Sequence, residues 1–417
     1  MDMRSQPVDR LKSSSTHLPS LLSGILFSLS GLFLLGIGLL MGFAALFSSF
    51  SRQSVQAQQT IFFIAFGFEA ILLFVAAFFA FQKMLEKPSA DQAAFLAIPR
   101  WQLIGGALIA ALSLLIGYLV GANNSLNWLI LPVLTIPAVV LPLVVVLAVG
   151  TRGLPMASRW QSWSVLGLGM TLTPLLLLVL ESVVAIIIFI GIVALVMVQP
   201  ELASQLEALS RQVIILGPQS ERAIDLLSPL LTRPEVIITA LIYVAVLVPA
   251  VEELIKPLGV WLLAGRLDSP AQGFTLGALS GAGYALIETV GVSGQAAEWA
   301  SLLFSRIGTG LLHITTSALV GAAIVLARRE RRYWNLIGTY LLAVLLHGLW
   351  NTFAMLFTFS NLADLLEQPG RLSTLQPMLL GVLGILAVAL FVILLVSNRK
   401  LRDAIPAAPT ETIDPAP

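Results

Sequence analysis

The segment VPAVEELIKP (248–257) lies within an apolar run that is long enough to cross a membrane, yet it carries Glu252, Glu253 and Lys256. An ionisable side chain at the centre of a spanning helix costs roughly 2.5–3.5 kcal/mol on insertion scales, so such groups must stabilise one another, bind an ion or line water. Helical spacing places Glu252 and Lys256 one turn apart on the same face, with Glu253 rotated by about 100°. The two prolines that bracket these residues weaken the local backbone hydrogen bonding and can bend the helix.

The composition around this segment identifies the class of protein. The chain has 417 residues, of which 58% are hydrophobic and 11% charged, and its mean hydropathy of +0.94 is too high for a soluble domain. Runs of twenty or more apolar residues without strand-like alternation leave helices as the way to pair the backbone in lipid. The sequence therefore predicts an all-α, polytopic transmembrane helix bundle.

Charge and cysteine content limit the chemistry. A net charge of +1 says nothing about partners, and no feature of the sequence suggests nucleic-acid binding. The absence of cysteine excludes disulfides, thiolate metal ligands and a cysteine nucleophile. Any metal would need histidine and carboxylate ligands, and the expected surroundings are the lipid bilayer.

The hydropathy pattern predicts about ten spans. Most Lys and Arg, including the clusters at 328–332 and 399–402, then fall on the side of the N-terminus, so both termini are expected in the cytoplasm (N-in, C-in). The predicted spans are 21–47, 61–81, 103–120, 128–149, 165–197, 236–263, 274–292, 302–327, 334–357 and 378–396. The fifth is long enough to tilt or to bend near Pro174.

These spans divide the chain into regions. The first five hold only Glu69 and Glu181 as intramembrane charges, and structural hydrogen bonds are the favoured role for both. The predicted regions are a cytoplasmic tail (1–19), a five-span scaffold (20–199), an extracytoplasmic amphipathic segment (200–235), a four-span catalytic core (236–357), a loop with the last span (358–398) and a disordered cytoplasmic tail (399–417).

The 201–235 segment has apolar residues at helical spacing between charged ones. Gly217 and Pro218 are expected to end its first helix, and Ser220 could cap a second short helix through Leu230. A helix lying in the membrane interface is the favoured interpretation, and a lid over a site below it is the alternative.

The seventh span combines close packing with polar groups. Gly273, Gly277 and Gly281 recur every four residues, which lets another backbone approach closely. Tyr284 and Glu288 follow on about the same face, so this helix brings a phenol and a carboxylate toward its neighbour. A site role for Glu288 is favoured over that of a carboxylate reaching water at the helix end.

The next two spans supply imidazoles. The eighth carries a polar stripe of Arg306, Thr309, His313 and Thr316, and the ninth carries His347 and Asn351 one turn apart. Imidazole suits proton transfer or metal ligation near neutral pH. A single histidine inside a membrane more often has a structural role as a hydrogen-bonded residue. Two histidines on helices beside a Glu-Glu pair favour a site for proton transfer or metal binding.

Four motifs in order on consecutive spans resemble the PrsW family of intramembrane proteases, which is related to the CPBP group that includes the CAAX prenyl proteases. The resemblance covers about residues 240–357. Two positions depart from the family pattern: Tyr284 stands where phenylalanine is usual, and Asn351 stands where PrsW proteins often have aspartate. The motifs are Glu252-Glu253-x-x-Lys256, Tyr284-x-x-x-Glu288, His313 and His347-x-x-x-Asn351.

The resemblance implies roles for these residues. Glu252 and Glu253 would activate water for attack on a peptide bond, with His313, His347 and Glu288 as metal ligands or acid–base partners. A carboxylate with imidazole can deprotonate water, Asn351 or an imidazole N–H can stabilise the oxyanion, and Lys256 would set the ionisation of its glutamate neighbour. Two histidines and a glutamate form the ligand set of catalytic zinc sites, yet a metal-free mechanism uses the same groups.

Three functions compete at this point. The first is an intramembrane endopeptidase of the bacterial cytoplasmic (inner) membrane that cleaves membrane-anchored protein substrates; the resemblance suggests signalling substrates such as anti-sigma factors. The alternative is a proton- or cation-coupled transporter that uses the same carboxylates, against which the lack of an internal repeat counts. The third is a noncatalytic scaffold in which the polar residues only hold helices together.

Overall fold

The computed structural model describes residues 17–51, 56–92, 98–121, 126–198, 200–217, 222, 226, 234–292, 298–365 and 373–405. Every regular element among them is a helix, which confirms the predicted all-α bundle. Nine stretches of the described chain are long and apolar enough to cross a membrane. The seventh predicted span, α13 (Pro270–Val292), is not among these nine because its many small and polar residues make it less apolar.

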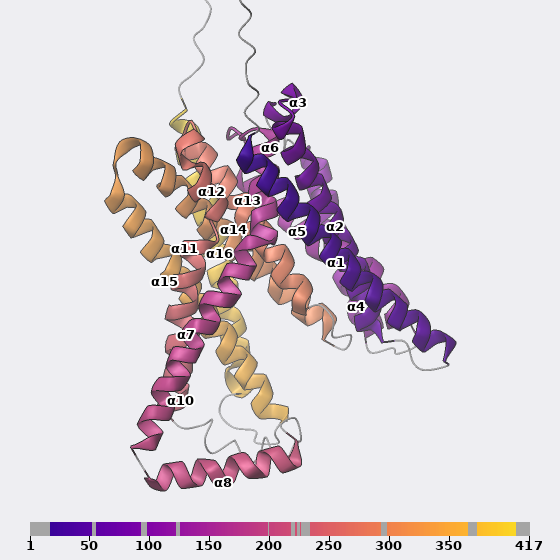
Figure 1. Cartoon of the computed structure of the whole chain (residues 1–417), viewed down its shortest axis with the longest axis vertical. Coiled ribbons are helices and arrows are strands. Elements are labelled where there is room, and N and C mark those ends of the chain that lie inside the picture. The colour runs from indigo at the N-terminus through magenta and orange to yellow at the C-terminus, as the bar shows by residue number, and fades with distance from the viewer. Residues whose placement is uncertain are drawn as a thin grey trace, which may run out of the picture.

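The first four long helices and one short helix form a group at one side of the molecule (Figure 1). α1 lies along α2, and its glycines face aromatic rings: a side chain at Gly24 would collide with the ring of Phe81, and one at Gly31 with that of Phe74. These glycines allow the two helices to pack closely. The helices of this group are α1 (Leu18–Phe50), α2 (Ala57–Met84), α3 (Pro88–Asp91), α4 (Arg100–Gly121) and α5 (Asn127–Gly150).

The predicted span 165–197 is broken at Thr171, between α6 (Arg159–Met170) and α7 (Leu172–Met197). The break precedes Pro174, which has no N–H to offer the preceding turn of helix. α6 packs inside the bundle against α13, whereas α7 is exposed along most of its length. The bend separates a buried half from a half that faces outward.

The centre of the bundle is α13 and α14 (Trp299–Glu330). Their backbones touch along the predicted glycine positions: a side chain at Gly277 would collide with the backbone carbonyl of Ser317, and one at Gly281 with that of His313. α14 is more deeply buried than any other of the nine candidate spans found among the described residues. The glycine spacing therefore predicted a real helix–helix contact, and this contact fixes α13 against the helix that carries a histidine.

The remaining helices pack around this pair. The sixth predicted span is interrupted by a π-helical turn and by Pro257, and α15 lies against it. These elements are α10 (Pro234–Ile242), η1 (Tyr243–Leu247), α11 (Val248–Ile255), α12 (Leu258–Leu263), η2 (Ala264–Arg266), α15 (Tyr333–Leu365), η3 (Ser373–Leu375) and α16 (Gln376–Asp403).

The first and last helices place both ends of the described chain at one end of the bundle. The ring of His17, before α1, packs against Trp160 with centroids 5.4 Å apart, and Asn398 near the end of α16 donates to the carbonyl of Gly150 at 2.9 Å. α8 (Pro200–Leu216) crosses the opposite end (Figure 1). This arrangement agrees with both termini on one side of the membrane and the amphipathic segment on the other. Which of these sides is cytoplasmic stays a prediction. The second short helix predicted through Leu230 lies outside the described residues.

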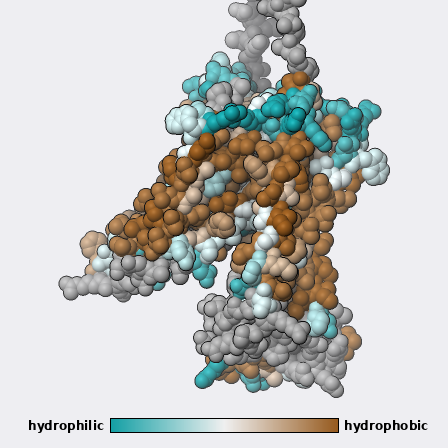
Figure 2. All heavy atoms as spheres, turned by 180° about the vertical axis from the view of Figure 1, so that it is seen from behind, coloured by the Kyte–Doolittle hydropathy of each residue, from teal (hydrophilic) through white to brown (hydrophobic). Residues whose placement is uncertain are grey.

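The surface has the pattern of a membrane protein. Figure 2 shows a broad apolar belt across the middle and a hydrophilic rim at the end that carries α3 and α6. Toward the other end, α1, α2 and α4 splay away from α7 and α10 (Figure 1), and the gap between them appears as a notch edged by less apolar residues (Figure 2).

Candidate active site

The broken sixth span positions the first three site residues. α11 begins after the π-helical turn and ends where Pro257 interrupts the backbone hydrogen bonds, so Glu252, Glu253 and Lys256 occupy its last turn. The carbonyl of Lys256 accepts a hydrogen bond from the hydroxyl of Ser280 on α13. α13 thus satisfies a backbone group at the proline break and fixes this turn against the centre of the bundle.

Lys256 is the hub of the site. Its ammonium nitrogen lies 2.6 Å from Oε1 of Glu253, 3.2 Å from Oε2 of Glu252, 2.8 Å from Nδ1 of His313 and 3.3 Å from Nδ1 of His347. All five residues are buried, and the lysine is fully so. An ammonium has three protons, so it cannot donate to four partners at once. Two carboxylates around one ammonium also leave one negative charge uncompensated, and this excess favours a proton or a metal cation.

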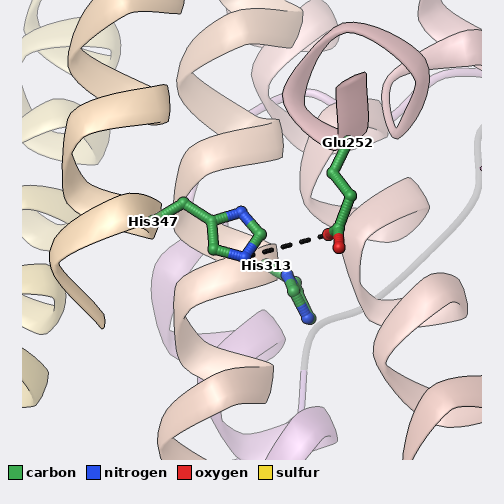
Figure 3. A group of neighbouring side chains, drawn as sticks. All are labelled: Glu252, His313 and His347. Carbon is green, nitrogen blue, oxygen red and sulfur yellow. Dashed lines mark ion pairs between the residues drawn. The ribbon is translucent and has the colours of Figure 1, made fainter. Parts of the chain in front are cut away.

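Glu253 determines which nitrogen of His347 is free. Its Oε1 lies 2.7 Å from Nδ1 of His347, and an ionised carboxylate can only accept, so Nδ1 carries the proton. The other nitrogen, Nε2, then presents a lone pair. It faces Oε2 of Glu252 at 3.9 Å, as Figure 3 shows. That oxygen is buried, and the ammonium of Lys256 lies 3.2 Å from it at ion-pair distance.

A second carboxylate does the same for His313. Oε2 of Glu288 lies 2.8 Å from Nε2 of His313, so Nε2 is the protonated nitrogen and Nδ1 presents its lone pair toward Lys256. Arg306 holds this carboxylate from the other side, with Nη2 2.5 Å from the same oxygen. The side chain of Glu288 is 34% exposed whereas Lys256 and its four partners are buried, so the cluster is most open at Glu288.

Tyr284 forms a wall of the site. Its ring meets the ring of His313 edge-on with centroids 5.0 Å apart, and the ammonium of Lys256 lies 5.5 Å from its centroid. A cation over an aromatic face is stabilised by the ring quadrupole. The phenylalanine that is usual at this position in the resembling family would keep that contact without the hydroxyl.

Asn351 does not join the cluster through its amide N–H. Its Nδ2 donates to the carbonyl of Val244 at 3.1 Å, inside the π-helical turn. Tyr340, on the same helix, donates to the carbonyl of Ala250 at 2.7 Å. The two bonds attach α15 to the π-helical turn and to the first turn of α11. Asn351 therefore holds the broken span in place with one of its two amide protons.

The donor set fits a metal ion. Glu252, His313 and His347 each offer one ligand atom, and these atoms lie within 4.8 Å of one another. Both imidazoles have a carboxylate on the far nitrogen, the arrangement that orients metal-ligating histidines. The oxygen of Glu252 that faces Nε2 of His347 completes the set. Glu288, expected as the third ligand, instead supports His313 from outside, and Lys256 competes with a cation for Nδ1 of His313.

The structure brings together the polar residues predicted from four spans, with Asn351 serving the neighbouring turn. Two contacts were not predicted: Arg306 with Glu288, and Tyr340 with the broken span. Each of these residues precedes a site histidine by seven positions, which places it on the same helix face two turns away, so the spacing could have indicated both. Of the two scaffold carboxylates, Glu69 is fully buried and neither of its oxygens has a partner among the described residues.

One of three comparisons with known proteins found a match. A family model described as PrsW family intramembrane metalloprotease matches residues 158–396. The match extends beyond the motifs at 240–357 to include α6, α7 and most of α16. Neither the curated proteins nor the solved structures contain a match to this chain.

Proposed function

Because this chain belongs to the PrsW family of intramembrane metalloproteases, we propose that it hydrolyses peptide bonds of membrane-anchored protein substrates at the cluster around Lys256. One observation carries the proposal: Oε2 of Glu252, which is ion-paired with Lys256 at 3.2 Å, faces the free nitrogen of His347 at 3.9 Å inside the bundle. These are two acceptors with no proton between them. Water is the simplest molecule that satisfies both, and it is also the reactant of hydrolysis.

Glu252 is the general base of the proposed reaction. As the water oxygen bonds to the carbonyl carbon of the substrate, the carboxylate takes a proton from the water. The same proton then passes to the amide nitrogen as the carbon–nitrogen bond breaks, giving a new carboxylate and a new amine. Lys256 holds the base through its 3.2 Å ion pair with Glu252. Glu253 in turn holds Lys256 at 2.6 Å and His347 at 2.7 Å.

Negative charge that develops on the substrate oxygen would be stabilised by Lys256. It is the only fully buried cation of the cluster, and charge interactions are stronger where water is excluded. Asn351 donates one of its two amide protons to Val244, which directs this amide toward the π-helical turn. We therefore assign this task to the lysine on the sixth span rather than to the asparagine on the ninth.

A metal ion would be held by Glu252, His313 and His347. Zinc, when bound, polarises a carbonyl and makes a coordinated water more acidic. The chain's own contribution is the protonation pattern of the ligands: Glu253 and Glu288 keep the far nitrogens protonated, so the two lone pairs point toward Glu252 and Lys256. The lysine must give up its contact with His313 when that nitrogen binds a cation.

The site lies on helices that cross the apolar belt, which supports a substrate anchored in the same membrane. Regulated proteolysis of signalling proteins, such as anti-sigma factors in the bacterial inner membrane, is the biological setting we propose. The transporter alternative uses the same carboxylates, and the family match favours the protease over it.

Cleavage by the full-length protein, reconstituted in liposomes with single-span candidate substrates, tests the proposal. Glu252→Gln is expected to lower kcat by about 100-fold or more, the usual contribution of a general base. Glu69→Gln is the matched control because it makes the same change at a buried carboxylate of α2, outside the site. Cleavage by the Glu252→Gln protein at the wild-type rate would overturn the assignment. Proton flux that this substitution abolishes, with no cleavage of any substrate, would favour the transporter.

A further inference from the structure

A large pocket lies on the other side of α13 from the active site. Its volume is about 410 Å³, within the roughly 300–1,000 Å³ of small-molecule sites. Residues of α13 that line it include Leu279, Ala282 and Leu286, which helical spacing places on the opposite face of the helix from the site residues Tyr284 and Glu288. The pocket is therefore separate from the site, although both share one helix. We call it the α2–α13 pocket; α2, α5, α6 and α13 form its walls.

The lining of the α2–α13 pocket is apolar except at one end. Thirteen of its fifteen residues are hydrophobic, and the two polar ones are Arg159 and Ser162 on the first turn of α6. The hydroxyl of Ser162 already has a hydrogen-bond partner within the chain, since it donates to the carbonyl of Ala157 at 3.5 Å. Arg159 has no ion pair with any described residue. The pocket thus offers a long apolar surface that ends at Arg159, a cation without an ion pair among the residues that the structure describes.

The pocket opens between helices that cross the apolar belt. Phe68 and Leu72 of α2, and Val140 and Val144 of α5, line it and are partly exposed, so its mouth lies beside the spanning parts of these helices. At the polar end, the ring of Trp163 stacks on a phenylalanine of α2 with centroids 5.9 Å apart. Tryptophan is enriched where hydrocarbon meets headgroups, which places this end at the membrane surface.

The charges around that end favour an anion. The connections on either side, 83–92 and 150–159, carry Lys83, Lys87, Arg152 and Arg159 against only two carboxylates. One of the two, Asp91, is already bound through both oxygens by Lys83 at 2.8 Å. An occupant with an apolar chain and an anionic end matches both parts of the pocket, and in a membrane that molecule is a phospholipid.

We propose that the α2–α13 pocket binds one acyl chain of an anionic phospholipid whose phosphate group pairs with Arg159. The bound chain fills space that side chains of four helices leave empty, and it packs against the helix that carries Tyr284 and Glu288. The proposal does not depend on proteolysis, so it stands or fails separately from the proposed function.

Lipid retention by the purified full-length protein tests the proposal. The protein is exchanged into detergent with equal amounts of phosphatidylglycerol and phosphatidylcholine, repurified, and its retained lipid is measured by mass spectrometry. We expect the wild-type protein to retain the anionic lipid about fivefold over the zwitterionic one, the preference that one basic side chain supplies at a membrane surface. Arg159→Gln should bring the ratio close to one, whereas Arg328→Gln, at an exposed arginine of α14 outside the pocket, should leave it unchanged.

Filling the pocket tests where the lipid binds. Ala282→Phe places a ring in the cavity from α13, and Val144→Phe does so from α5, so each should remove the preferentially retained lipid. Ala111→Phe makes the same change at an exposed position of α4 and should have no effect. Glycerol phosphate without acyl chains should not displace the lipid. Equal retention of the two lipids by the wild-type protein, unchanged retention in both filled variants, or displacement by glycerol phosphate would each overturn the proposal.

Discussion

Replacing Lys256 by methionine should destabilise the protein more than any other single lysine substitution in the chain. The methionine keeps the length of the side chain and removes its charge, which leaves Glu252 and Glu253 buried together without a cation. Removing one partner of a buried ion pair typically costs about 3–5 kcal/mol. We therefore expect the free energy of unfolding, measured by denaturant titration in detergent, to fall by about that amount. A proton on one carboxylate can replace the lost charge, so the loss should be smaller in acid.

A double-mutant cycle separates this charge effect from a packing effect. Combining Lys256→Met with Glu253→Gln removes both charges of the closest pair, and the double variant should recover more than about 1 kcal/mol relative to the sum of the single losses. Lys83→Met is the matched control, because its ion pair with Asp91 is partly exposed and such pairs contribute about 1 kcal/mol or less. Additive losses in the cycle, or an equal loss in the control, would refute the argument that the lysine compensates buried carboxylates.

Three further outcomes are expected from the geometry. Gly277→Leu should prevent the two central helices from packing and reduce the folded yield, whereas Gly105→Leu, where no neighbouring atom lies within 4 Å, should not; equal yields would contradict this. Asn351→Ala leaves the carbonyl of Val244 without its partner and should cost about 1–3 kcal/mol of stability, so an unchanged unfolding free energy would count against the contact. Zinc titrated into chelator-treated protein should bind once per chain, and His347→Ala should weaken binding by more than about 100-fold, beyond the loss typical of an outer partner; equal affinity would exclude this histidine as a ligand.

The sequence was sufficient to predict which residues are polar inside the membrane and which helices carry them. Burying charge in hydrocarbon is costly, so Glu252, Lys256, His313 and His347 were expected to contact one another. In the structure Lys256 lies within hydrogen-bond or ion-pair distance of the other three. The glycine spacing on α13 likewise predicted the backbone contact with α14, because only glycine permits that approach.

The orientation of individual groups could not be predicted from spacing. Asn351 follows His347 by one turn and was expected to face the same site, but its amide reaches the π-helical turn. The π-helical turn lies in the sixth span, where its extra residue rotates the preceding backbone by about 100° relative to a continuous helix and so changes which carbonyls face α15. Hydropathy does not reveal such a turn. Spacing also could not show that Glu252, and not Glu288, is the carboxylate grouped with the two histidines as a metal ligand. Glu288 is instead paired with Arg306, and that pairing was not predicted.

The glycine contact between α13 and α14 has a mechanical consequence. Two backbones that touch without intervening side chains cannot slide past each other in small steps, so the distance from Glu288 to His313 is fixed by the main chain. The broken span is fixed in the same way, because a side chain at Gly348 of α15 would collide with the backbone carbonyl of Ala245 in η1. Main-chain contacts therefore position both helices that carry a site histidine, α14 against α13 and α15 against η1.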